Sequence, residues 1–122
     1  MKIKELMDLY DSLKIVGDKE LPFDTALIVA KNLDIIRVPA EVADKKRREI
    51  IDKYLYRDED GKPIKAFEGA YKLTDSVACN KELEELMGKD IEIDTICPIP
   101  RETLSGLTIA PVKLSPILKY IE

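Results

Sequence analysis

Four consecutive cations, Lys45 to Arg48, are the part of this sequence with the clearest chemical potential, because lysine and arginine bind the phosphates of nucleic acids. They lie in residues 37–57, which carry seven basic and four acidic side chains. The whole chain has a net charge of −4, so its overall field repels nucleic acid unless a local patch overrides it. One hypothesis is therefore a nucleic-acid site made by these residues: Arg37, Lys45, Lys46, Arg48 and Lys53.

The spacing of the four cations favours a plainer interpretation. Consecutive residues point about 100° apart on a helix, so they surround it, whereas phosphate binding works best when cations share one face. Three acidic residues also stand four positions before a basic one, a spacing that forms ion pairs along a helix: Glu41–Lys45, Asp44–Arg48 and Glu49–Lys53. A solvated section of helix explains the run without a ligand.

Cysteine and metal chemistry have little support. The chain has two cysteines, Cys79 and Cys97, and no histidine, so it lacks a histidine base for a thiol nucleophile and the four ligands of a structural zinc site. The N-terminal segment is amphipathic and unlike a signal peptide, which favours a reducing cytoplasm. We expect two free, buried cysteines.

Two acidic stretches could be taken for sites. The stretch RDEDGK resembles part of a calcium loop, but aligning Gly61 with the loop glycine puts Tyr56 at the first ligand position and Phe67 at the twelfth. The acidic stretch LEELMGKDIEID, residues 83–94 with Glu82 before it, is explained by a solvated face. We therefore expect no catalytic residue, metal or cofactor, and a protein that is not an enzyme.

The elements that must position these residues begin with a helical hairpin. Apolar residues at helical spacing predict a helix from Lys2 to about Ile15, ended by Gly17, and a long helix from Phe23 to Leu55. Pro39 either kinks the long helix or splits it at Val38, and we favour a kink because the apolar pattern keeps its phase across the proline.

A second apolar stripe repeats every seven residues on the long helix, at Ile28, Ile35 and Val42. The first helix covers only one side of its neighbour, so this stripe must meet either the C-terminal half of the chain or another subunit. We predict these three residues as partner-binding residues.

The C-terminal half reads as a smaller α+β part. We expect a turn over residues 57–63, a short strand around Ala70 to Leu73, a helix capped by Asp75 or Ser76 and stopped by Gly88, and a strand over residues 90–96. The two strands would form one small element with the helix between them. One helical turn is expected over residues 101–104 and a last helix over 115–121, with an earlier start at Pro111 as the alternative.

Together these elements predict an α+β fold that is mainly α: a long helical hairpin over residues 1–57, and over 58–122 a two-stranded β element with short C-terminal helices. The 122 residues have the length of one domain. No apolar run reaches the roughly 20 residues that span a bilayer, so we expect no membrane contact.

The segments LPFDTALIVAKNL, YRDEDGKP, KELEELMGKDIEID and PIPRETLSGLTIAP, with a short terminal helix, resemble small bacteriophage-encoded proteins of unknown function. The resemblance covers most of the chain. It implies a phage accessory role, as a virion or assembly component or as a binder of a host factor, in the bacterial cytoplasm or on the virion. The predicted function is a non-catalytic interaction module whose partner is a protein, including a second copy of itself, with nucleic-acid binding as the alternative.

Overall fold

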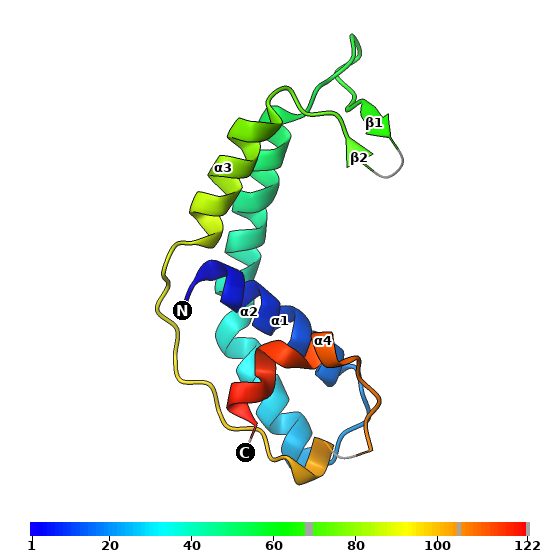
Figure 1. Ribbon diagram of the computed structural model, residues 1–122. Helices are drawn as coiled ribbons and strands as arrows, with labels where there is room; N and C mark the ends of the chain where they lie inside the picture. The colour runs from blue at the N-terminus through cyan, green and yellow to red at the C-terminus, as the bar shows by residue number, and fades with distance from the viewer. Residues whose placement is uncertain (68–69, 105, 122) are drawn as a thin grey trace.

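The computed structural model of the chain, which describes residues 1–67, 70–104 and 106–121, is mainly helical (Figure 1). The two largest elements are α1 (Ile3–Gly17) and α2 (Phe23–Tyr54). The others, with η marking a 3-10 helix, are β1 (Lys65–Phe67), β2 (Ala70–Tyr71), α3 (Ser76–Met87), η1 (Glu102–Leu104), α4 (Pro111–Leu114) and η2 (Ser115–Tyr120). The predicted fold class, mainly α with a small β element and short C-terminal helices, is confirmed.

The main core lies between α1 and the N-terminal half of α2. The buried apolar residues of α1 recur every three or four positions and so line one face of the helix: Ile3, Leu6, Leu9, Leu13 and Val16. On α2 the buried face is formed by Val29, Ile36, Ala40 and Ala43, with the polar Thr25 and Asn32 beside them. Of these residues, Ile3 and Ala43 belong to the second core described below. The expected helical hairpin is therefore present.

The long helix α2 continues through Pro39 without a break, which confirms one helix instead of two. Proline has no N–H, so the carbonyl of Ile35 loses its helical hydrogen bond at this point. The helix continues past the proline because Ile36 before it and Ala40 after it are both buried in the main core.

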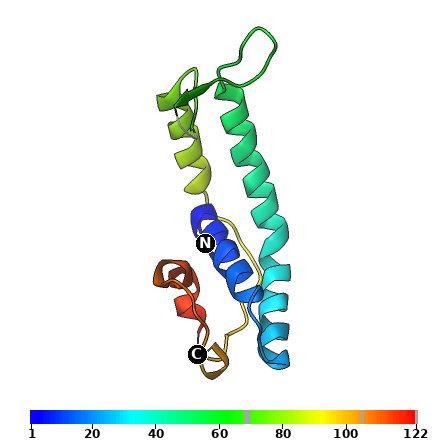
Figure 2. The same cartoon turned by 90° about the vertical axis from the view of Figure 1, so that its right-hand side faces the viewer.

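The two shorter helices α1 and α3 lie end to end along α2 (Figure 2). α3 is capped by the Asp75 carboxylate, which accepts from the Ala78 amide, and packs on the C-terminal half of α2. Backbone hydrogen bonds join its end to the start of α1, from Ile3 N–H to the Lys89 carbonyl (2.9 Å) and from Ile91 N–H to the Met1 carbonyl (2.8 Å). A second, smaller core seals this junction with Ile3, Ala43 and Leu86.

The strand predicted over residues 90–96 is wrong. Asp90 makes one isolated bridge, to Lys2, and residues 91–98 form no regular element. The alternating apolar residues Ile91 and Ile93 instead pack, half-buried, against the helical core, where no sheet edge is available. The paired strands are β1 and β2, adjacent in sequence, so the predicted strand–helix–strand element is also wrong, although the strand at Ala70 is confirmed.

Residues 91–98, called the extended segment, are held in place by one buried side chain of α2. Asn32 of α2 is fully buried, its Nδ2 donates to the Cys97 carbonyl (2.9 Å), and its Oδ1 accepts from the Cys97 amide (2.8 Å). These two bonds hold the chain so that Ile96 and Ile99 enter the main core.

The C-terminal elements close the other side of the core. Ile117 of η2 is fully buried, the Ile99 amide donates to the Tyr120 carbonyl, and the Ser12 hydroxyl of α1 donates to the Lys113 carbonyl. The turn predicted at 101–104 is confirmed as η1, and the C-terminal helical segment begins at Pro111, the earlier of the two predicted starts.

The described residues of the segments 55–67 and 70–73 form a tip at the far end of α2 and α3 (Figure 1). Gly61 has a positive φ of 78° in its turn, and the backbone bonds of the tip connect it to itself and to the end of α2. None of the described residues between 51 and 85 belongs to either core.

Candidate interaction surfaces

The three residues predicted to bind a partner do not form one exposed surface. Ile28 and Ile35 are half-buried and pack against the main core, which includes Ile96 and Ile99 of the chain's own C-terminal half. Val42 is 56% exposed. The structure thus separates Val42 from the other two.

A different set of large apolar side chains is exposed along α2. Phe23 is 78% exposed, Leu27 44%, Val38 59% and Val42 56%. At 100° per residue these four positions lie within about 100° of one another on the helix, so they share a face. We call them the α2 stripe.

The α2 stripe faces away from the rest of the protein. α1 and α3 both lie on the opposite side of α2, and no described element is packed against its outer side (Figure 2). Between its apolar ends the same face carries exposed Lys31 and Asp34. The spacing of Phe23 to Leu27 and of Val38 to Val42, four residues each, is visible in the sequence and would have identified the stripe.

The predicted nucleic-acid residues are all exposed, and four of the five have an acidic partner. Arg37 pairs with Asp34 (3.7 Å) and Lys46 with Glu49 (3.3 Å). The other two pairs are Arg48–Asp44 (2.9 Å) and Lys53–Glu82 (2.6 Å). Of the three predicted i,i+4 pairs, Asp44–Arg48 forms, whereas Lys53 reaches α3 in place of Glu49.

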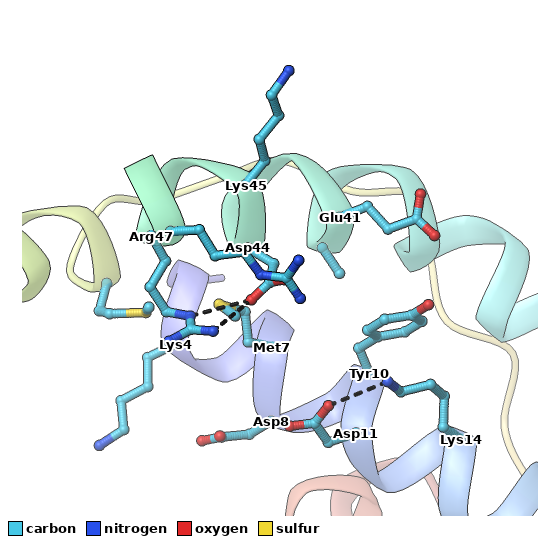
Figure 3. A pocket seen from close by; sticks show the side chains of 13 residues that line it. Lys4, Met7, Asp8, Tyr10, Asp11, Lys14, Glu41, Asp44, Lys45 and Arg47 are labelled. Carbon is cyan, nitrogen blue, oxygen red and sulfur yellow. Dashed lines mark hydrogen bonds and ion pairs between the residues drawn. The ribbon is translucent and has the colours of Figure 1, made fainter. Parts of the chain in front are cut away.

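The part of α2 that carries the predicted cations, residues 37–53, is called the basic section. A groove of about 740 Å³ lies between α1 and α2 beside it (Figure 3). Asp44 lies at its centre and binds both Arg47 and Arg48 at 2.9 Å. Lys14 pairs with Asp11 (3.7 Å) and lies over the ring of Tyr10, whereas Lys45 points away from α1. Because four carboxylates stand among the five cations that line it, the groove offers no concentrated positive charge to an anion.

A small polar cluster ties α2 to α3. The Lys53 ammonium donates to Glu82 Oε1 at 2.6 Å, and its hydrogen bond, with that of Tyr54, lowers the pKa of the Glu82 carboxyl. The same bonds to Glu82 raise the pKa values of Lys53 and Tyr54. Burial raises the pKa of the neighbouring Cys79 thiol, and nearby Glu82 adds to the effect, so the thiol is a weak nucleophile.

Cys79 and Cys97 are both free thiols, as expected; Cys79 is buried and Cys97 half-buried. Within residues 1–67, 70–104 and 106–121, no group of three or more His, Cys, Asp or Glu side chains is placed to hold a metal ion. No helix in this part of the chain is both long and apolar enough to span a bilayer. No protein-family model, curated protein or solved structure matches the sequence.

Proposed function

We propose that this protein is a non-catalytic interaction module that binds a protein partner through the α2 stripe. The observation that supports the proposal is the exposure of four large apolar side chains on one face of a helix whose opposite face packs against the chain itself. Apolar residues gathered on one surface mark sites of protein contact more often than isolated ones do. The half-buried Ile28 and Ile35 would contribute at the edge of this contact, next to Val42.

The resemblance to small phage-encoded proteins suggests the setting. We propose a phage accessory role, either in the virion and its assembly or in binding a host factor in the bacterial cytoplasm. A helix that presents an apolar stripe between charged residues suits both, because each requires a specific contact between folded proteins and neither requires a reaction.

Site-specific photo-crosslinking tests the proposal. A photoreactive amino acid at Val38, inside the stripe, is compared with one at Val77, a valine on α3 that is 78% exposed and outside the stripe. Irradiation in bacterial cells that make the protein should give a discrete crosslinked product from position 38 and none from position 77. Equal products from both positions, or none from either, would contradict the proposal.

The alternative function is nucleic-acid binding by the basic section, supported by the exposure of all five predicted cations. Because four of them already pair with carboxylates, we expect weak binding at most. Fluorescence anisotropy with labelled DNA and RNA decides the matter: phosphate contacts require an affinity that falls steeply as salt rises. Absence of binding at low salt eliminates this alternative.

A further inference from the structure

The apolar residues of the α2 stripe are placed symmetrically about the middle of the stripe. About a midpoint between Asn32 and Leu33, Phe23 is the mirror position of Val42, and Leu27 is that of Val38. Nearest the midpoint, the cationic Lys31 is the mirror position of the anionic Asp34. All six of these side chains, Phe23, Leu27, Lys31, Asp34, Val38 and Val42, are exposed.

This symmetry is what an isologous contact between two identical helices requires, because a two-fold axis places each residue opposite its mirror position. Leu27 and Val38 are eleven residues apart, close to three full turns, so both point in nearly the same direction and would meet across the axis. Lys31 would lie beside Asp34 of the second copy, and this opposite-charge contact would form twice.

We propose that the α2 stripe binds a second copy of this chain, with the two α2 helices antiparallel and Leu27 against Val38 of the other copy. The proposal rests on the proposed function, since it names the partner of the same surface. Lys31 forms no ion pair among the described residues, and the Asp34 carboxylate has one exposed partner on its own helix, Arg37 at 3.7 Å. Both charges are therefore available to the other copy.

The size of the contact sets its strength. From Phe23 to Val42 the stripe is about 28 Å long at 1.5 Å per residue. A single pair of helices over that length buries less than the roughly 1,600 Å² of a standard interface, so we expect a weak, reversible dimer. The same register also brings Asp24 near Glu41 of the second copy, an unfavourable pair at each end of the contact.

Sedimentation equilibrium of the purified full chain, over concentrations from about 1 to 500 µM, measures this association. We expect a monomer–dimer equilibrium that Val38→Asp abolishes and that the matched exposed variant Val77→Asp leaves unchanged. Glu41→Lys should strengthen the dimer at least several-fold, because it converts the repulsive end pair into an attractive one. Circular dichroism checks that each variant keeps its helix content.

A charge exchange tests the antiparallel arrangement itself. Lys31→Asp and Asp34→Lys should each give a monomer when alone, because each sets like charges against one another at both central contacts. Mixing the two variants should restore a heterodimer, since one chain is then acidic at both central positions and the other chain is basic at both. A parallel, in-register pair would set Lys31 against Lys31 and Asp34 against Asp34 in the native chain as well. Neither variant would then change the number of like-charge contacts, so neither alone would lose the dimer.

The outcomes separate this proposal from the more general one. A strict monomer at all concentrations, or failure of the mixed variants to associate, overturns the proposal of a second copy. If Val38 then still crosslinks to a different protein in cells, the interaction function stands and its partner is not a second copy. If neither assay responds to position 38, both proposals fail.

Discussion

Replacing Asn32 by alanine should cost more stability than any other single polar substitution on α2, because its amide carries both bonds that hold the extended segment. Asn32→Ala removes two hydrogen bonds and leaves the Cys97 amide and carbonyl unpaired beside the core. Each lost partner in such a place costs about 1–2 kcal/mol, so we expect a loss of about 2–4 kcal/mol. A folded chain of this length has about 6–18 kcal/mol in total, so the loss is a large fraction of it.

Urea denaturation measures this loss directly. With a slope near 2 kcal/mol per molar, the midpoint should fall by about 1–2 M. The matched control is Asn80→Ala, since Asn80 is an exposed asparagine on α3 and its change should shift the midpoint very little. Hydrogen exchange adds a local readout: the Cys97 amide should lose protection relative to the Leu9 amide inside α1. A midpoint equal to that of the control, with Cys97 still protected, would refute the role assigned to Asn32.

Three further predictions concern single groups. Glu82→Gln should lower stability at neutral pH, because it removes the charged pair with Lys53. The folded-state pKa of Glu82 lies below its ordinary value of 4.5, so this pair stabilises the protein above pH 4.5 and its contribution fades as pH falls through the folded-state value. Urea midpoints of the variant and the native protein should therefore converge in acid, and a constant difference from pH 7 to pH 3 would contradict the assignment. Thr25→Val should raise stability by about 1 kcal/mol, because the buried Thr25 hydroxyl has no hydrogen-bond partner among the described residues, and a destabilised variant in thermal melts would show that the hydroxyl is satisfied in solution. Thiol titration of the native protein should label Cys97 well before the buried Cys79, and Cys97→Ser should leave only the slow phase; a fast phase in that variant would mean that Cys79 is accessible.

The helices could be predicted from the sequence because their signals are local. Apolar residues three and four apart mark one face of a helix, and Gly17, Asp75 and Gly88 supply the stop and cap chemistry. Even the continuity of α2 through Pro39 follows from the apolar phase on both sides, since burial of that face outweighs one missing backbone bond.

The extended segment and the partner surface depend on which parts of the chain meet, and local patterns do not contain that information. The alternation at Ile91 and Ile93 satisfies a strand pattern, yet here its neighbours are helices, and a side-chain amide from Asn32 takes the place of a β ladder. Ile28 and Ile35 were expected to need a covering element, and the main core covers them in part. The four-residue spacing of the α2 stripe can be read from the sequence, but a buried face has the same spacing. Only the three-dimensional structure shows which of the two faces is covered.

The separation of the tip from both cores makes it a natural position for engineering. A peptide epitope or a small affinity label inserted at the Gly61 turn would extend into solvent, where it displaces no packed side chain and leaves the hairpin at the other end of the molecule intact. The two ends of the long rod can thus serve different purposes, one as the folded body and the other as a handle for display or detection.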